Sequence, residues 1–171
     1  MLFRSKIKKE PLTDFLVRLY EAGGYESVCV LGFNPHAGDD GVFGTEDDEI
    51  KEAIKAANEK IEKDIFEGPC PPDTAFTPKN REKYKVFVAM YHDQGLAPLK
   101  ALYFDESINV SLGLPIVRTS VDHGTAFDIA YTLSASTKSY ENAVKEALMK
   151  CGKLIPWHVV TISTEGKILD E

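Results

Sequence analysis

The feature that most constrains the fold is an apolar run, 86–90, that ends in the polar segment Tyr91-His92-Asp93-Gln94-Gly95. An uninterrupted apolar run of this length predicts a strand buried on both faces, as in a parallel sheet that helices cover on both sides. In open α/β sheets, ligands bind beyond the carboxyl ends of the strands. The polar segment is therefore expected to lie where a ligand would bind.

Two further segments repeat this arrangement of an apolar stretch followed by a polar one. Residues 27–32 run into Asn34-Pro35-His36-Ala37-Gly38, and residues 115–120 run into Asp122-His123-Gly124-Thr125-Ala126. Three of the four histidines in the chain thus follow predicted strands and lie close to a glycine. We expect these three histidines at the ends of strands.

The rest of the chain predicts helices between the strands. Apolar residues recur at helical spacing over 11–22 and 49–65, and a third helix is expected with Ser139 as its N-cap. The packing face of this third helix is expected to hold Ala143, Val144, Ala147, Leu148 and Cys151. Strands alternating with helices predict an α/β fold in three layers, with a parallel or mixed sheet.

The expected organisation of the chain has three parts. These are a lead-in with one helix (1–26), an α/β body (27–153) and a tail with a strand-like stretch (154–171). Within the body, the proline-rich segment 68–72 is expected to be extended, and short strands are expected at 108–112 and 115–119. The chain has no GxGxxG sequence, so nothing calls for a Rossmann dinucleotide site.

Charge and hydropathy argue against several classes of protein. The net charge is -7 and there is no basic stripe, which argues against nucleic acid as a partner. No apolar run reaches the length of about 18 residues that a membrane span needs. The amino terminus lacks the apolar core of a signal peptide, and Cys29 and Cys151 are expected to be reduced core residues. The expected location is cytoplasmic.

His36, His92 and Asp73 are the candidate metal ligands. Neutral imidazoles and a carboxylate suit zinc or a similar divalent ion, and a catalytic site keeps one position open for the substrate. The three residues are far apart in the sequence, so this hypothesis depends on their shared position after predicted strands and extended segments. The alternative is that each is a polar surface residue beside a loop.

Lys100 and Arg118 are the candidates for binding an anion. Arg118 is expected at the end of an apolar strand, where a lone charge is costly unless a ligand or a carboxylate compensates it. The alternative to an anionic ligand is an ion pair with an acidic residue such as Asp122. Asn109 alternates with apolar neighbours and is expected to face polar surroundings or a ligand.

Two loops complete the set of candidates. The segment 122–126 offers backbone amides beside a glycine, which suits either a ligand that approaches the main chain or a tight turn. The acidic stretch around 39–48 is expected to be solvated surface, with Asp47 and Asp48 favouring the start of a helix.

At these residues the chain resembles the 4-hydroxythreonine-4-phosphate dehydrogenase family. The resemblance lies in five motifs in order along the chain: Asn34-Pro35-His36-Ala37-Gly38, Pro72-Asp73-Thr74-Ala75-Phe76, Ala89-Met90-Tyr91-His92-Asp93-Gln94-Gly95, Asn109-Val110-Ser111-Leu112-Gly113-Leu114-Pro115 and Arg118-Thr119-Ser120-Val121-Asp122-His123-Gly124-Thr125-Ala126. Together they cover roughly residues 27–150.

This resemblance implies a fold and an activity. The implied fold is like that of isocitrate and isopropylmalate dehydrogenases, with two α/β domains and a cleft between them, of which this chain holds one domain and part of the second. The implied enzyme is a homodimer whose metal site draws on both subunits. It oxidises 4-phosphooxy-L-threonine with NAD, and the product loses carbon dioxide, in the pathway to pyridoxal phosphate.

The resemblance also implies roles for single residues. His36 and His92 match ligands of a divalent metal (zinc, magnesium or cobalt), and Asp73 matches an acidic residue beside it. Substrate-binding positions are matched by Lys100, Asn109 and Arg118. The stretch that holds His123, Gly124, Thr125, Ala126 and Asp128 is similar to the loop that binds the adenosine half of NAD. No further catalytic residue is expected.

Members of this family are longer than this chain, by a factor of about two. The chain is therefore expected to be the carboxyl-terminal half of such an enzyme. The resemblance implies that the other half carries a third metal-ligating histidine and a His-Thr pair that contacts the substrate. The chain alone is expected to be nearly inactive. Two alternatives are a related dehydrogenase acting on erythronate phosphate or a dihydrodiol, and a non-catalytic fragment that binds metal or nucleotide.

Overall fold

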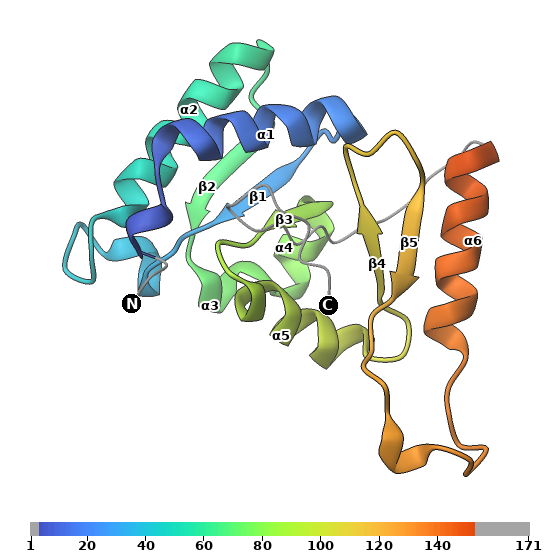
Figure 1. Ribbon diagram of the computed structural model, residues 1–171. Helices are drawn as coiled ribbons and strands as arrows, with labels where there is room; N and C mark the ends of the chain where they lie inside the picture. The colour runs from blue at the N-terminus through green and yellow to red at the C-terminus, as the bar shows by residue number, and fades with distance from the viewer. Residues whose placement is uncertain (1–3, 153–171) are drawn as a thin grey trace. The chain divides into compact units, whose positions relative to one another are not determined.

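The computed structural model describes residues 4–152 of the chain. The predicted tail at 154–171 lies outside the described residues. The described chain divides into two compact units, the first reaching to Leu96 and the second beginning at Ala97 (Figure 1). Each unit has a sheet of its own.

Unit 1 is built on three parallel strands in the order β2-β1-β3. The central strand β1 (Val28–Leu31) pairs with β2 (Phe66–Cys70) on one side and β3 (Val86–Val88) on the other. Every residue of β1 and β3 is buried, as expected for a parallel sheet covered on both faces. The prediction of an α/β fold with a parallel sheet is confirmed.

Two long helices, α1 (Lys9–Gly23) and α2 (Glu46–Ile61), lie side by side over this sheet (Figure 1). Leu16 and Ile50 are fully buried, in agreement with the predicted apolar faces. α2 begins and ends earlier than the predicted helix 49–65. The segment that follows α2 pairs with β1 as strand β2, whereas the sequence had predicted only an extended segment there.

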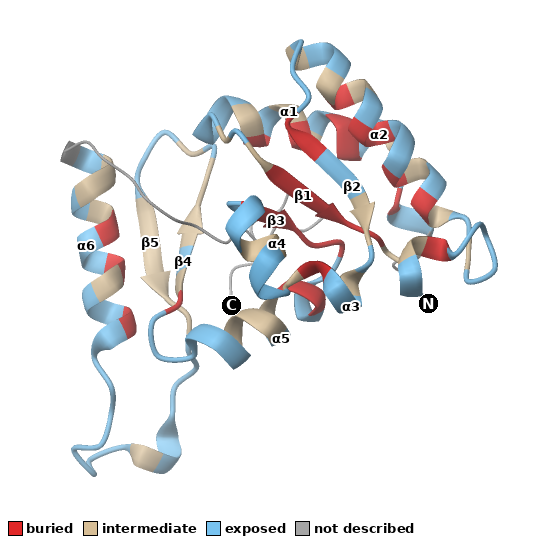
Figure 2. Cartoon of the chain, turned by 180° about the vertical axis from the view of Figure 1, so that it is seen from behind, coloured by how far each residue is buried: buried red, intermediate tan, exposed pale blue. Residues whose placement is uncertain are grey.

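The other face of the sheet is covered by shorter elements. Ala75 of α3 (Pro72–Ala75) packs against this face, and α4 (Pro78–Lys83), which buries no residue, follows α3. Cys29 and Leu31 of β1 pack in one cluster with Ala75 and Phe87, and Figure 2 shows β1 and β3 in the colour of buried residues. Unit 1 therefore has three layers. The helix α5 (His92–Tyr103) begins in unit 1 and continues into unit 2.

Unit 2 holds an antiparallel pair, β4 (Ile108–Ser111) and β5 (Arg118–Val121), and the helix α6 (Lys138–Gly152). The predicted strand at 115–119 is placed too early in the chain. Pairing of Ser111 with Arg118 closes the hairpin, so residues 112–117 form its connection. Arg118 therefore begins its strand, and the prediction that it ends an apolar strand is wrong.

The packing face of α6 also differs from the prediction. Ala143 is buried as expected, but Val144, Leu148 and Cys151 are exposed, and the polar residues Ser139 and Glu146 are buried instead. Polar contacts set this orientation, because Thr119 Oγ1 donates to Ala143 O at 2.9 Å. The expectation that Cys151 is a core residue is wrong.

The start of α6 is two residues earlier than expected, because an N-cap at Ser139 would make Tyr140 the first helical residue. The helix begins at Lys138, so Ser139 lies inside its first turn and is not the N-cap. Ser139 Oγ instead donates to Ser107 O at 2.7 Å and accepts from the backbone amide of Asp122 at 3.2 Å. Of the described helices, none combines the length and the apolar character that crossing a membrane requires.

Candidate functional site

His36 follows β1 in a strained loop. It lies in the short 3-10 segment η2 (Pro35–Gly38), where His36 and Ala37 adopt φ values of 53° and 54°. Asp39 and Asp40 continue this left-handed conformation at 45° and 50°. Each such residue costs of order 1 kcal/mol, a strain that clusters at functional sites. The His36 side chain is exposed to solvent, and the centroid of its ring lies 6.0 Å from the centroid of the Phe43 ring.

Asp47 holds this loop from the first turn of α2. Its Oδ1 accepts from the amide of Phe33 at 2.8 Å, and its Oδ2 accepts from the amide of Asn34 at 3.1 Å and from Asn34 Nδ2 at 2.8 Å. Both side chains are buried. The prediction of a solvated surface is therefore wrong for Asp47, because the carboxylate pairs with the main chain that leaves β1.

His92 follows β3 and is the first residue of α5. Its Nδ1 lies 2.7 Å from Asp93 Oδ1, and both side chains are exposed. A histidine that donates through Nδ1 to a carboxylate leaves Nε2 as the acceptor, which is the arrangement of many metal-ligating histidines. In the tautomer that carries its proton on Nδ1, His92 leaves Nε2 as an exposed acceptor.

Asp73 lies just beyond β2, in the one-turn helix α3, and is exposed. Because β2, β1 and β3 are parallel neighbours, their carboxyl ends meet at one edge of the sheet (Figure 1). Asp73, His36 and His92 therefore all follow the same edge. The sequence prediction that His36 and His92 lie at strand ends is confirmed.

These donors fit a divalent ion in type, since imidazoles and a carboxylate with exposed lone pairs suit zinc and similar metals. They do not fit it in number. Within residues 4–152, no three His, Cys, Asp or Glu side chains come close enough together to hold one ion. A complete coordination shell would need further ligands beyond those that the described chain brings together.

Sequence reasoning placed Gln94 in a segment where a ligand would bind and gave Asn34 no role of its own, and the structure buries both side chains. Asn34 carries an amide oxygen with no hydrogen-bond partner. Each side chain comes directly after, or close after, a buried apolar run. An amide side chain just after a buried apolar run is the one sequence signal that could have identified such a residue, because a buried amide must find main-chain or side-chain partners.

In unit 2, Lys100 is paired with Asp122. Lys100 Nζ lies 3.1 Å from Asp122 Oδ2 and also donates to the backbone oxygen of Asp122. Ser107 Oγ donates to the same carboxylate oxygen at 2.8 Å. The acidic partner that was considered for Arg118 thus belongs to Lys100, and an anion at Lys100 would share the ammonium with Asp122.

Arg118 and Asn109 lie on the hairpin of unit 2. Arg118 Nη1 donates to Ser111 Oγ at 3.1 Å across the two strands. Asn109 is exposed between two half-buried neighbours, in agreement with the predicted alternation. Both residues therefore present polar groups at the hairpin surface.

The segment 123–128 follows β5 as an exposed loop. His123 follows the end of β5, as expected, but this strand is antiparallel to β4 and does not belong to the parallel sheet. His123 Nδ1 lies 3.0 Å from Gly124 O, and Ala126 adopts a φ of 47° before the 3-10 turn η3 (Phe127–Ile129). A Cβ added at Gly124 would meet no atom within 4 Å, so the main chain there is open to approach.

A second cluster of titratable groups in unit 1 joins β2 to the end of α4. Glu67 pairs with Lys83 at 2.5 Å and with Tyr84 OH at 2.9 Å, and these contacts lower the pKa of Glu67. Beside them, a hydrogen bond with Cys70 and burial raise the pKa of the Cys29 thiol. Cys29 is a buried free thiol, as predicted.

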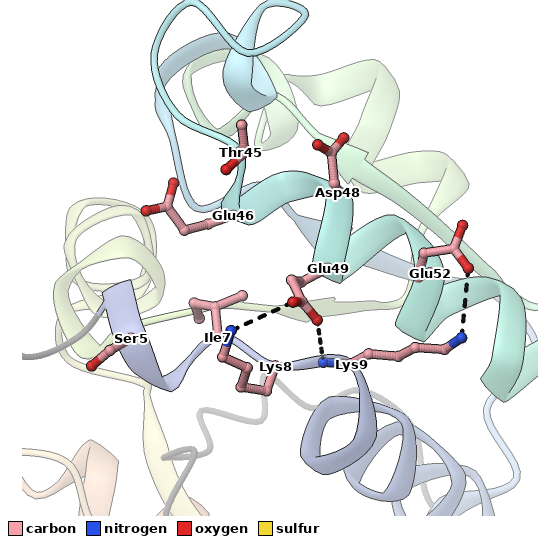
Figure 3. Close-up of a pocket in the computed structure, with 9 residues that line it drawn as sticks. All are labelled: Ser5, Ile7, Lys8, Lys9, Thr45, Glu46, Asp48, Glu49 and Glu52. Atoms are coloured by element: carbon pink, nitrogen blue, oxygen red, sulfur yellow. Dashed lines mark hydrogen bonds and ion pairs between the residues drawn. The ribbon is translucent and has the colours of Figure 1, made fainter.

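An open polar hollow of about 580 Å³ lies between the amino-terminal ends of α1 and α2, and Figure 3 shows the side chains that line it. Its charges are largely paired: Glu49 accepts from Lys8 Nζ at 3.5 Å and from the Lys9 amide at 2.9 Å, and Lys9 Nζ pairs with Glu52 at 3.6 Å. No predicted site residue lines this hollow.

Comparison with known proteins gives a consistent result. The sequence profile of the family described as "Pyridoxal phosphate biosynthetic protein PdxA" matches residues 4–147. The 4-hydroxythreonine-4-phosphate dehydrogenase of Sulfurimonas denitrificans is 62% identical over 144 residues, which are 84% of this chain and 47% of that protein. The chain thus spans about half the length of the curated relatives it matches.

Two solved structures resemble the chain. The crystal structure of 4-hydroxythreonine-4-phosphate dehydrogenase from Klebsiella pneumoniae matches with a TM-score of 0.62 at 43% identity, covering 80% of this chain and 40% of that one. A terephthalate 1,2-cis-dihydrodiol dehydrogenase from Burkholderia xenovorans matches with a TM-score of 0.57 at 30% identity, covering 90% of this chain and 50% of that one.

Proposed function

The chain belongs to the family of the pyridoxal phosphate biosynthetic protein PdxA. From that premise we propose that it forms the carboxyl-terminal portion of a metal- and NAD-dependent dehydrogenase that oxidises 4-hydroxythreonine 4-phosphate. One observation carries the proposal. Within a segment 62% identical to such a dehydrogenase, His36 and His92 follow neighbouring parallel strands at one edge of the sheet.

Unit 1 would contribute the metal donors. His92 offers Nε2 while Asp93 holds its other nitrogen, and His36 and Asp73 present exposed donor atoms. A bound divalent ion would lower the pKa of the substrate hydroxyl and stabilise its alkoxide, and NAD would accept the hydride.

Unit 2 would contribute groups for anions. The guanidinium of Arg118 suits the bidentate geometry of a carboxylate or phosphate, and Lys100 supplies a point charge that Asp122 holds in place. Asn109 would add an amide contact. The exposed main chain of 123–128 would bind the adenosine half of NAD, with the open space over Gly124 allowing close approach.

Assembly and location are parts of the same proposal. A second copy of the enzyme would complete the metal site, which agrees with the shortage of ligands within residues 4–152. The buried Cys29 thiol suits a reducing cytoplasm. Sedimentation of the complete enzyme, with and without zinc, would show whether it is a dimer.

A chimera tests the activity directly. Residues 4–147 of this chain would replace the matching segment of the Sulfurimonas denitrificans enzyme, which supplies the remaining length. NADH formation at 340 nm would be followed with 4-hydroxythreonine 4-phosphate, with erythronate phosphate and with a terephthalate dihydrodiol. The last substrate is included because of the structural match to a dihydrodiol dehydrogenase.

The expected result is turnover of 4-hydroxythreonine 4-phosphate at a kcat/KM within about tenfold of the parent enzyme, and at least about 100-fold lower values for the other two substrates. A His36→Ala chimera serves as the inactive control. A folded chimera that prefers either alternative substrate would reassign the substrate. A folded chimera that produces no NADH from any of them would contradict the proposal.

A further inference from the structure

One buried side chain, Gln94, joins the two strand ends that carry His36 and His92. Gln94 Nε2 donates to Gly32 O at 2.7 Å, and Gln94 Oε1 accepts from the backbone amide of Met90 at 2.7 Å. Gly32 directly follows β1, and Met90 lies two residues beyond β3. The amide thus spans the gap between the two neighbouring strands just where their pairing stops.

The third strand end is connected to the same line of hydrogen bonds. The backbone amide of Gly32 donates to the oxygen of Cys70, the last residue of β2, at 2.8 Å. The hydrogen-bonded line therefore runs from Cys70 through Gly32 and Gln94 to Met90. Each candidate donor follows shortly after one of these anchored positions: Asp73 after Cys70, His36 after Gly32 and His92 after Met90.

Only a carboxamide satisfies both main-chain partners of Gln94. A carboxylate in its place accepts from Met90 but sets an oxygen against the oxygen of Gly32, which then lacks its donor. An apolar side chain leaves both buried main-chain groups unpaired. Gln94 is 8% exposed, and both its donor and its acceptor bond to main-chain groups of unit 1. These two hydrogen bonds explain why a glutamine stands at this position, without contact with a ligand.

We propose that Gln94 is a positioning residue that fixes the spacing of the β1 and β3 ends, and through them the approach of His36 and His92 to a shared divalent ion. The inference rests on the proposed function, because metal binding is part of that function. Gln94 touches neither histidine in the contacts described above and acts only through the main chain.

The chain offers a matched control at the opposite end of the sheet. Asn58 Nδ2 donates to Phe66 O at 3.0 Å, and the backbone amide of Phe66 donates to Asn58 Oδ1 at 3.1 Å. This is the same pair of amide contacts, made to the first residue of β2 and remote from the strand ends. Asn58→Asp and Gln94→Glu each remove a carboxamide donor and keep an acceptor oxygen.

The experiment compares the metal-free full chain with its Gln94→Glu, Asn58→Asp and His36→Ala variants. Zinc binding is measured by calorimetry at pH 7, and amide hydrogen exchange is measured without metal. We expect Gln94→Glu to weaken zinc binding at least tenfold, about the lower limit for residues that support metal ligands. Exchange should accelerate about tenfold at residues 32–37 and 90–93 in this variant alone. Asn58→Asp should keep zinc binding within about twofold.

The outcomes separate the inference from the proposed function. A zinc affinity in Gln94→Glu that matches the parent, or that falls no further than in Asn58→Asp, would overturn the positioning role. If the parent binds no zinc, or His36→Ala binds it equally well, the proposed metal site in this chain fails. The exchange data then decide the inference alone: acceleration confined to the two strand ends supports it, and unchanged exchange there rejects it.

Discussion

The two units of the chain build their sheets in opposite ways. In unit 1 every residue of β1 and β3 is buried, and helices cover both faces of the parallel sheet. In unit 2 no residue of β4 or β5 is buried, and a single helix packs on the antiparallel pair. A two-stranded pair has marginal stability by itself, whereas a covered parallel sheet supplies a core. Unit 1 is therefore the rigid frame of the described chain, and it carries the candidate metal donors.

The largest expected effect falls on the core of unit 1, and the same substitution at an exposed position of unit 2 provides the comparison. Leu16→Ala removes a fully buried side chain from unit 1 and should lower the free energy of unfolding by about 2–5 kcal/mol. Leu148→Ala, on the exposed face of α6, should change it by no more than about 0.5 kcal/mol. Urea denaturation of both variants makes the measurement. An equal loss in the two would mean that Leu148 is buried in solution and would break the comparison.

A smaller loss is expected from the carboxylate that holds the His36 loop. Asp47→Ala leaves the amides of Phe33 and Asn34 without their acceptor and should cost about 2 kcal/mol. Asp48→Ala is the control, because this neighbour is exposed and contributes only a favourable charge at the start of α2, worth up to about 1 kcal/mol. Denaturation curves that shift equally for both variants would contradict the role assigned to Asp47.

In unit 2 the comparable polar anchor is Ser139. Ser139→Ala removes its hydrogen bonds to Ser107 O and from the Asp122 amide and should cost about 1 kcal/mol. The loss should be local, so hydrogen exchange should accelerate in α6 and β5 while β1 keeps its protection. Faster exchange throughout unit 1 would show that the units unfold together, which would weaken the distinction between them.

The smallest expected effect concerns the partly exposed ion pair between Glu67 and Lys83 in unit 1. Hydrogen bonds from Lys83 and Tyr84 hold the pKa of Glu67 below its ordinary value of 4.5. A lowered pKa contributes stability that is present above pH 4.5 and is lost as the pH falls through the folded-state pKa. The difference in unfolding free energy between the parent and Glu67→Gln should stay constant above about pH 5 and shrink below pH 4.5. A difference that persists unchanged to pH 3 would contradict this pairing.

Unit 1 could be predicted from sequence in much of its detail. Uninterrupted apolar runs have one main solution, a covered strand, and this placed β1, β3 and the positions of His36 and His92 after them. The strand β2 was missed as a strand because its residues, Phe-Glu-Gly-Pro-Cys, lack an apolar pattern. Its place is set by pairing with β1, which no local pattern records.

Unit 2 was predicted less well, because half-exposed elements leave weaker patterns. The apolar residues Ile116 and Val117 favoured an early strand, yet they are exposed in the hairpin connection. On α6 the apolar stripe predicted one packing face, and hydrogen bonds from Thr119 and Ser139 selected another. The burial of Gln94 and Asp47 was not predicted for a related reason: their partners are main-chain groups brought close only by the fold.

The most direct test of the account is zinc binding by the metal-stripped full chain, measured by calorimetry alongside its His36→Ala, His92→Ala and His123→Ala variants. The first two remove donors at the parallel strand ends of unit 1, whereas the third removes the histidine that follows the antiparallel hairpin of unit 2. The account predicts that zinc binding weakens more than about 100-fold in the first two variants, because losing a ligand costs more than losing a residue that supports one. In the third variant, zinc affinity should stay within about twofold of the parent. Equal binding by all four proteins, or a loss confined to His123→Ala, would contradict the claim that the strand ends of unit 1 hold the metal.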